Sequence, residues 1–308
     1  MPTALRLNHP VTPLQECVHP LFDQRGISLW IKRDDLNHPA IQGNKWHKLK
    51  LNLAYAHHKG FEQLLTFGGA YSNHIAAVAE AGNLYGWQTF GFIRGDELES
   101  QQQAWSSTLK KAAHNGMQLV FLDRKTYRLR DDQAWLHALQ QHYPRAYILP
   151  EGGSNPLALD GFESLITELN QQLDFTHLLC AVGSGGTLAG LVKYAKPDQQ
   201  VWGIATLKQA EYLIPRIQGW AGEDKANWRL CTAFHGGGYG KTTEDITRQA
   251  QVFEKRFDVP LDPVYTAKLI YGFNQLLERN EFKPGSRIVL YHSGGLQGRQ
   301  VQDDCVLT

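Results

Sequence analysis

The sequence predicts an α/β fold with largely parallel sheets, because short apolar runs alternate with helical segments along the chain. In the helical segments, apolar residues recur at three- and four-residue spacing. Glycine-rich loops follow several of the short runs, at the strand ends where open α/β sheets bind ligands. At about 150 residues per domain, a chain of 308 residues suggests two lobes.

The apolar runs expected to form strands are residues 27–31, 64–67, 89–93, 118–122, 147–149, 178–182, 201–205 and 287–291. The segments expected to form helices are residues 45–58, 75–84, 101–114, 131–141, 157–172, 244–257 and 266–278. Glycines at position 43 and in the turn at 151–156 could bracket an inserted lobe. We therefore predict a small α/β domain at residues 48–157, inserted into a large domain formed by residues 1–47 and 158–308.

A glycine loop follows the strand predicted at 178–182 and leads into an apolar helical segment. This arrangement is typical of a phosphate-binding site, because backbone N–H groups can approach an anion closely there. Hydroxyl groups and the helix dipole add further stabilisation. The loop residues are Gly183, Ser184, Gly185, Gly186 and Thr187.

Lys45 lies at the head of the helix predicted at 45–58, directly after Gln42, Gly43 and Asn44. A lysine that opens a helix is either an ordinary solvated surface residue or an amine that binds an aldehyde. The phosphate loop favours the second interpretation. One aldehyde-binding amine and one phosphate-binding loop together predict pyridoxal phosphate as the cofactor.

Three further glycine loops lie at residues 68–74, 234–240 and 292–298, and the first and last directly follow predicted strands. Glycine also ends strands for purely structural reasons, so one such loop alone says little. Together with the loop at 183–187, the three loops favour a small-molecule site.

Composition argues against several other classes of protein. A formal charge of +1, without clustered Lys and Arg, argues against nucleic acid or an anionic membrane as the main partner. No segment has the length of a signal-peptide core or a membrane span, so a cytoplasmic protein is expected. No Cys-x-x-Cys pair indicates a metal site or a disulfide framework. Cys17, Cys180, Cys231 and Cys305 are expected to be reduced thiols.

Six sequence blocks, in order, resemble those of the D-cysteine desulfhydrase and 1-aminocyclopropane-1-carboxylate (ACC) deaminase family. The blocks are KRDDL at 32–36, GNK at 43–45, GGAYSNH at 68–74, EGGSN at 151–155, GSGGT at 183–187 and DPVYT at 262–266. The resemblance implies a pyridoxal-phosphate enzyme of fold type II, like tryptophan synthase β. Such enzymes have two lobes, each a three-layer sandwich, with the cofactor between them. The resemblance also implies a homodimer.

The resemblance assigns cofactor-binding roles. It implies that Lys45 holds the cofactor covalently, that Asn73 bonds to the phenolic oxygen of the cofactor, and that residues 183–187 bind its phosphate. The freed amine of Lys45 would also take the α-proton of the substrate, provided that partial burial keeps it neutral.

The resemblance also suggests substrate-binding residues. Ser72 would bind the substrate carboxylate or relay a proton, although it could equally cap the helix that follows. Asn44 could contact the same carboxylate or satisfy the backbone of its turn. Tyr71 and His74 lie in the same loops, and His74 is expected to support the site rather than act as a base.

Two tyrosines match positions where family members have active-site tyrosines near the substrate. They are Tyr239, in the loop at 234–240, and Tyr265, in the DPVYT block. Ordinary packing is the alternative for both. By the resemblance, Lys45, Ser72, Tyr239 and Tyr265 form the catalytic set.

The expected reaction depends on the residues near the ring nitrogen of the cofactor. ACC deaminases of the family have Glu after the tyrosine of the DPVY block and Leu before the last Gly-Gly, whereas this chain has Thr266 and Ser293. A neutral hydroxyl withdraws electrons through the ring less strongly than a carboxylate partner does. This favours β-elimination from a D-amino acid such as D-cysteine over the opening of a cyclopropane.

Two departures from the family pattern leave the substrate open. Tyr71 stands where many members have Gln, and residues 296–298 differ from the usual stretch after the last Gly-Gly. ACC deaminase and amino-acid racemase activities on the same scaffold remain alternatives. A non-catalytic ligand-binding protein would have no need of Lys45, Ser72 and the two tyrosines.

Overall fold

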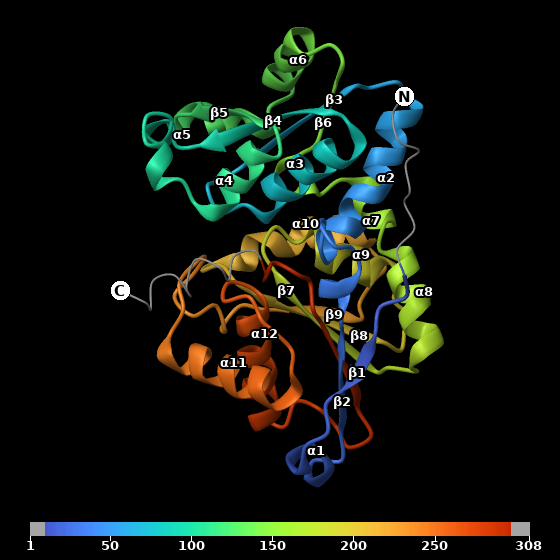
Figure 1. Cartoon of the computed structure of the whole chain (residues 1–308). Coiled ribbons are helices and arrows are strands. Elements are labelled where there is room, and N and C mark those ends of the chain that lie inside the picture. Colours follow the sequence, from blue (N-terminus) through green and yellow to red (C-terminus); the bar gives the residue numbers. More distant parts are fainter. Residues whose placement is uncertain (1–9, 297–308) are drawn as a thin grey trace.

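The computed structural model describes residues 10–296. Within this range the chain forms two sheets, each flanked by helices, which lie one above the other in Figure 1. The expectations for the N-terminal segment, for Gln297 and Gly298 of the last glycine loop, and for Cys305 lie outside the described residues.

The larger sheet combines the N-terminal strands with strands from the second half of the chain. Its order is β1-β2-β10-β7-β8-β9, and only the β1–β2 pair is antiparallel. Its strands are β1 (Leu14–Glu16), β2 (Ser28–Lys32), β7 (His177–Val182), β8 (Gln200–Ala205), β9 (Trp228–Cys231) and β10 (Arg287–Tyr291).

The smaller sheet is entirely parallel, in the order β5-β4-β3-β6. Its strands are β3 (Gln63–Gly68), β4 (Gln88–Arg94), β5 (Gln118–Leu122) and β6 (Ala146–Ile148). All four lie within the small domain predicted at residues 48–157. Helix α2 crosses the boundary predicted after residue 47, and the domain limits stay a prediction.

Helices fill the intervals between the strands of both sheets. The α-helices are α1 (Pro20–Gln24), α2 (Asn44–His58), α3 (Asn73–Tyr85), α4 (Ser107–His114), α5 (Arg124–Tyr127), α6 (Gln133–His142), α7 (Pro156–Asp160), α8 (Glu163–Gln172), α9 (Gly186–Tyr194), α10 (Leu213–Ala221), α11 (Glu244–Phe257) and α12 (Thr266–Glu278). Short 3-10 helices are η1 (Asp34–Leu36), η2 (Asp96–Leu98), η3 (Gln102–Ala104), η4 (Arg128–Asp131), η5 (Glu151–Gly153) and η6 (Ala210–Tyr212).

Each sheet is covered on both faces, so each lobe is a three-layer sandwich. Along β7, Leu179 and Ala181 pack towards α11 and α12, whereas Leu178 and Cys180 pack towards α8, α9 and α10. In the smaller sheet, α2, α3 and α4 cover one face, and α5 and α6 cover the other. Burial on both faces explains why these strands are continuous apolar runs.

The eight predicted strands are all present, and two predicted helices need correction. The helix expected at 101–114 begins only after Ser106, whose hydroxyl accepts a hydrogen bond from Leu109 N and caps α4. The helix expected at 157–172 is divided into α7 and α8 at Gly161. A Cβ at Gly161 would lie 1.9 Å from the carbonyl oxygen of His47, so this glycine lets α2 approach closely.

Five of the strands and α-helices were not predicted: β1, β9, α1, α5 and α10. The two strands are edge strands of three and four residues, too short to give a clear apolar pattern. Helix α10 contains Pro215 and Gly219, which usually interrupt helices, but Pro215 lies in the first turn, where its missing N–H is not needed. No helix between residues 10 and 296 is long and apolar enough to cross a membrane.

Candidate active site

The start of α2 is held in place by the loop before it. Asn37 accepts a hydrogen bond from Gly43 N at 2.9 Å and donates one to Gly43 O at 3.0 Å. Gly43 has φ +64°, and a Cβ there would lie 1.9 Å from the carbonyl oxygen of Ser293. Only glycine fits this close approach. The first turn of α2, with Lys45, is therefore fixed against the loop that follows β10.

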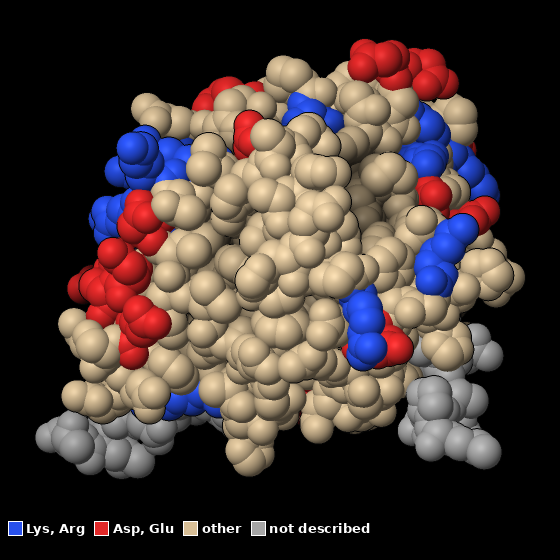
Figure 2. All heavy atoms as spheres, turned by 90° about the horizontal axis from the view of Figure 1, so that it is seen from above, with Lys and Arg blue, Asp and Glu red and all other residues tan. Residues whose placement is uncertain are grey.

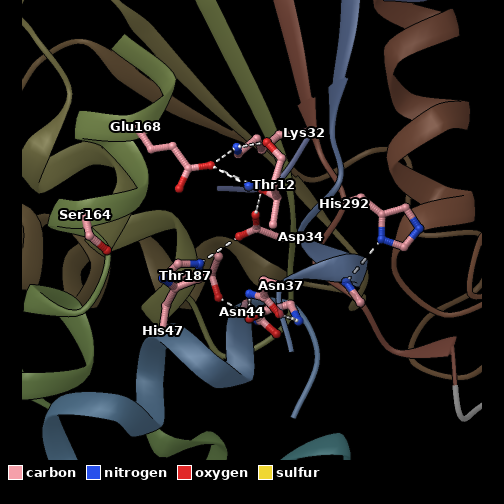
Figure 3. A network of polar contacts seen from close by, with 12 residues as sticks. Thr12, Lys32, Asp34, Asn37, Asn44, His47, Ser164, Glu168, Thr187 and His292 are labelled. Carbon is pink, nitrogen blue, oxygen red and sulfur yellow. Dashed lines mark hydrogen bonds and ion pairs between the residues drawn. The ribbon is translucent and has the colours of Figure 1, made fainter. Parts of the chain in front are cut away.

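A buried charged network packs against the start of α2 (Figure 3). Asp34 is fully buried and its carboxylate lies 2.7 Å from His47 Nε2 and 2.7 Å from the hydroxyl of Thr12. Lys32 forms an ion pair with Glu168 and donates to Thr12 O. The KRDDL block is therefore a structural support that ties β2 and α8 to the helix of Lys45.

Lys45 is half-buried, and its Nζ donates to Asn44 Oδ1 at 3.1 Å. Burial lowers the pKa of Lys45 from 10.5 to about 8, although the nearby Asp262 carboxylate opposes the shift. A lysine with this pKa is largely neutral slightly above pH 8, and only the neutral amine is a nucleophile or a base. Lys45 thus has the electrostatic setting that covalent attachment requires.

The glycine loop at 183–187 ends at the N-terminus of α9. Gly185 precedes the helix with φ +89° and no side chain caps the helix, so the first backbone N–H groups are available to an anion. Thr187 Oγ1 accepts a hydrogen bond from Asn44 Nδ2 at 2.8 Å. This contact connects the loop directly with the residue next to Lys45.

The loop has two partners that the sequence did not reveal, Lys48 and Ser154. Lys48 Nζ donates to Ser154 Oγ and to Gly152 O, each at 2.9 Å. A Cβ at Gly186 would lie 2.2 Å from Ser154 Oγ and 3.2 Å from Lys48 Nζ. The absence of a side chain at Gly186 therefore leaves a cradle between helix α9, a hydroxyl and an ammonium group.

Lys48 is buried without a carboxylate partner among the residues that the structure describes. Burial, together with the charge of Lys45, lowers the pKa of Lys48 well below 10.5. Holding a cation in such a place is unfavourable unless an anion joins it. The cradle at Gly186 therefore fits the phosphate of pyridoxal phosphate. We expect this phosphate to be bound by Lys48, Ser154 and the N-terminus of α9.

We predict that Lys48→Met weakens cofactor binding by about 10- to 100-fold, because a hydrogen bond to a charged group contributes roughly 1.5–3 kcal/mol. The unfolding free energy of the apoprotein should stay the same or rise, because the variant no longer buries an uncompensated ammonium group. Titration of apoprotein with pyridoxal phosphate and thermal melting give the two quantities. Lys59→Met, at an exposed position after α2, is the control. Equal cofactor affinity in both variants would contradict the role of Lys48.

The loop at 68–74 leads into α3. Ser72 caps this helix by accepting a hydrogen bond from Ile75 N at 3.3 Å, which confirms its alternative role as a cap. Asn73 Nδ2 would lie 3.1 Å from a Cβ at Gly295, so this loop meets the loop that follows β10. The ring of Tyr71 is mostly exposed, with 65% of its surface accessible.

His74 is buried beneath the same loop. Its Nε2 lies 2.9 Å from the hydroxyl of Thr66, and its Nδ1 has no hydrogen-bond partner among residues 10–296. Burial and the charges of Lys45 and Lys48 lower the pKa of His74 well below 6.5. A histidine in this setting is neutral, in agreement with a supporting role rather than that of a base.

Tyr239 and Tyr265 lie together, with ring centroids 6.2 Å apart in an edge-to-face arrangement. Tyr265 packs on Gly183, where a Cβ would lie 3.2 Å from its ring, so this tyrosine adjoins the phosphate loop. The hydroxyl of Tyr239 donates to Tyr71 O at 3.4 Å and so reaches the loop at 68–74. The pKa of Tyr265 is raised well above 10, first by burial and then by Tyr239, so its hydroxyl is protonated.

Asp262 is a buried carboxylate that the sequence did not single out. Its oxygens accept hydrogen bonds from the backbone N–H groups of Val264, Tyr265 and Thr266 at 2.8–2.9 Å, and from the hydroxyl of Thr266 at 2.8 Å. Asp262 thus caps the start of α12 and accepts the hydrogen bond that the Thr266 hydroxyl donates. Ser293 is partly exposed, and its hydroxyl has no hydrogen-bond partner in the described part of the chain.

The sequence matches the family described as pyridoxal-phosphate dependent enzymes over residues 5–294. The chain belongs to this family. Pyridoxal phosphate is therefore its cofactor, as the lysine and the glycine loop predicted. The arrangement of Lys45, the cradle at Gly186 and the buried ammonium of Lys48 fits the cofactor independently of the family match.

Two relatives and one solved structure show how the family members compare. The chain is 28% identical to a bifunctional D-cysteine desulfhydrase/ACC deaminase, mitochondrial, from Arabidopsis thaliana, over 95% of this chain and 78% of the relative. It is 27% identical to a D-cysteine desulfhydrase from Klebsiella pneumoniae, over 92% of this chain and 91% of the relative. A crystal structure of an ACC deaminase homologue superposes with a TM-score of 0.83 at 27% identity, covering 98% of this chain and 95% of the other.

These comparisons confirm the two-lobed fold of type II and the expected resemblance. The individual site residues rest on the geometry described above. That geometry groups Lys45, Asn44 and the phosphate loop on one side, with Ser72, Asn73, Tyr239 and Tyr265 around them. The sequence missed Lys48 and Ser154, although the EGGSN block contains Ser154 and Lys48 follows Lys45 by one helical turn.

The lowered pKa of Lys45 predicts how fast the cofactor attaches to the apoprotein. Below pH 8 most of the amine is protonated, and the protonated form cannot attack the aldehyde. The rate should therefore rise with pH and level off above a midpoint of about 8. Stopped-flow absorbance after mixing apoprotein with pyridoxal phosphate, from about pH 6.5 to about pH 10, measures this profile. A rate that keeps rising towards the ordinary lysine pKa of about 10.4 would contradict it.

Proposed function

We propose that this protein is a β-eliminase that acts on D-cysteine, or on a small D-amino acid with a comparably good leaving group. With D-cysteine, one water is consumed and pyruvate, ammonia and hydrogen sulfide are formed. ACC deaminases of the family have a carboxylate near the ring nitrogen of the cofactor. This chain has the neutral hydroxyl groups of Thr266 and Ser293 instead, and this observation carries the proposal. The names of the two relatives support the same substrate class.

Pyridoxal phosphate, when bound, supplies an aldehyde for the substrate amine and a ring that withdraws electrons from the α-carbon. The chain itself provides the groups that move protons. With cofactor and substrate bound, the ε-amine of Lys45 would be placed to remove the α-proton. A pKa of about 8 leaves a useful fraction of this amine neutral at physiological pH.

The two tyrosines are placed to assist the leaving group. Burial keeps the Tyr265 hydroxyl protonated, and Tyr239 lies beside it at the opening of the site. Either hydroxyl could donate a proton to a departing thiolate. Ser72 and Asn44 remain the candidates to bind the substrate carboxylate. Asn44 contacts Lys45, and Ser72 precedes Asn73, which lies against the loop after β10.

The ring nitrogen decides between elimination and ring opening. Asp262 is the buried carboxylate near Lys45 and Asn73, but its oxygens are occupied by the N-terminus of α12 and by Thr266. Ser293 would then supply the hydroxyl partner of the nitrogen, and this hydroxyl has no negative charge. Weaker electron withdrawal suffices for a thiolate, which leaves readily, whereas opening a cyclopropane demands more.

A product assay over a panel of substrates tests the proposal. We expect the holoenzyme to release pyruvate and sulfide from D-cysteine, and to form little or no 2-oxobutyrate from ACC. Chiral chromatography of the recovered amino acids detects racemisation in the same samples. Efficient conversion of ACC without activity on any D-amino acid would favour the deaminase alternative, and interconversion of enantiomers without pyruvate would favour the racemase.

Assembly and location are further proposals, the first based on the family resemblance and the second on the sequence pattern described above. We propose that the protein acts as a homodimer in the cytoplasm. Light scattering coupled to gel filtration measures the mass in solution, and a mass of one chain of 34.8 kDa would exclude the dimer.

A further inference from the structure

A cavity of about 330 Å³ lies beside the candidate active site, on the small domain. Its lining consists of four arginines and one tyrosine, Arg94, Arg124, Tyr127, Arg128 and Arg130. Arg94 ends β4, and the others lie on α5 and η4, directly after β5. The cavity is therefore at the carboxyl edge of the smaller sheet. In Figure 2, basic and acidic side chains both lie along the left edge, the side on which Figure 1 shows α5.

The positive charges around this cavity are only partly neutralised. Arg130 pairs with Glu151 at 2.6 Å, and Arg124 reaches Glu97 only at 3.9 Å through an exposed pair. The guanidinium groups of Arg94 and Arg128 form no ion pair or hydrogen bond with any residue from 10 to 296. Guanidinium groups that repel one another around a cavity are stabilised by an oxyanion, which each of them can bind through two parallel hydrogen bonds.

The cavity has a rigid base. Tyr127 is 2% exposed, and its hydroxyl donates to Glu151 at 2.6 Å. The guanidinium groups of Arg94 and Arg130 lie over its ring, 6.0 Å and 5.1 Å from the centroid. These contacts hold the guanidinium groups of Arg94 and Arg130 at the cavity before any ligand binds. Arg94 and Arg130 are thus partly preorganised, whereas Arg124 and Arg128 are exposed and have no contact with this ring.

The cavity adjoins the active site but is separate from the phosphate cradle. Arg94 Nη2 lies 3.8 Å from the Cβ position of Gly69, in the loop that carries Ser72 and Asn73. Glu151, which joins Tyr127 and Arg130, leads into the turn that supplies Gly152 O and Ser154 to Lys48. The pKa of Tyr239 is raised by burial, and the charges of Arg94 and Glu151 act on it in opposite directions.

We propose that this cavity is a second anion site, which binds a small molecule or group carrying a carboxylate, sulfonate or phosphate at the mouth of the active site. The anion has two possible sources, the distal group of an amino-acid substrate or a separate small anion. Both require the same recognition by guanidinium groups. Because the site is defined by its own residues, it does not depend on which reaction the holoenzyme catalyses.

Calorimetric titration of the holoenzyme with inorganic phosphate tests the site, because bound cofactor already fills the cradle at Gly186. We expect saturable binding that the double variant Arg94→Gln/Arg128→Gln weakens by at least about tenfold, since hydrogen bonds between charged groups contribute roughly 1.5–3 kcal/mol. Arg145→Gln is the matched control, because Arg145 lies at the opposite end of the same sheet, next to the start of β6. Phosphate binding should be unchanged in that variant.

Competition distinguishes the two sources. If the distal group of a substrate occupies the site, D-aspartate should displace phosphate and its neutral counterpart D-asparagine should not. If a separate anion binds, neither amino acid should displace it, and the double variant should still lose phosphate binding. Absence of saturable phosphate binding to the wild type, or equal affinity in the double variant and the Arg145 control, would overturn the proposal. A failure of the proposed β-elimination would leave all these measurements unaffected.

Discussion

Lys45→Ala should lower turnover by at least about 10³-fold, because it removes both the covalent anchor and the proposed base, and general base catalysis alone contributes about 10²–10⁴-fold. The side chain lies on the surface of the site rather than in the core, so the fold should persist. Steady-state release of pyruvate gives the activity. Circular dichroism and thermal melting show whether the apoprotein remains folded.

Reduction with borohydride and peptide mapping identify the lysine that carries the cofactor. The label should be on Lys45 in the wild type and should be absent from Lys45→Ala. Lys59→Ala, at the opposite end of α2, is the control for loss of a lysine, and it should keep full activity. Label recovered on Lys48 or Lys241 would contradict the assignment, whatever the activity of the variants.

The elements that sequence predicted correctly are those with strong local patterns. Strand β7 is an uninterrupted apolar run because both its faces are buried, and α11 begins at Thr243, whose hydroxyl accepts from Ile246 N. The phosphate loop and Lys45 were found because glycine and lysine have special chemistry next to a helix start. These features depend on neighbours within about one helical turn or one strand.

The features that sequence did not reveal depend on contacts between distant segments. Lys48 Nζ meets Ser154 across 106 residues, and His47 meets Asp34 inside the protein, where a charged run is unusual. The predicted helix is interrupted at Gly161 because the backbone of α2 packs directly against this glycine. Such contacts decide which lysine is buried and where a helix is divided, and no local pattern of residue types encodes them.

The glycines of the phosphate loop show the same distinction. A side chain at Gly185 would require φ +89° and would contact Ile217, 2.9 Å from the new Cβ. A substitution there would strain the backbone and disturb the core, so it could not separate folding from cofactor binding. Gly186 lies in α9 and has no positive φ. Its missing side chain faces the hydroxyl of Ser154 and the ammonium of Lys48.

Gly186→Ala should therefore weaken cofactor binding by roughly a hundredfold, or about 2.8 kcal/mol at 1.4 kcal/mol per factor of ten. The added methyl group would lie 2.2 Å from Ser154 Oγ and 3.2 Å from Lys48 Nζ, so it would displace two of the groups expected to bind the phosphate. Alanine is a good residue for the first turn of α9, which limits the cost to folding. Titration of apoprotein with pyridoxal phosphate measures the affinity.

Gly219→Ala, inside α10, is the matched control, because the nearest atom to its new Cβ is a carboxylate oxygen of Glu223 at 3.8 Å. It should leave cofactor affinity unchanged. If Gly186→Ala lowered the melting temperature of the apoprotein and left cofactor affinity at the level of this control, the loop would be a structural turn. The cofactor phosphate would then have to bind elsewhere, and the role of Lys48 would fail with it, since the same cradle defines both.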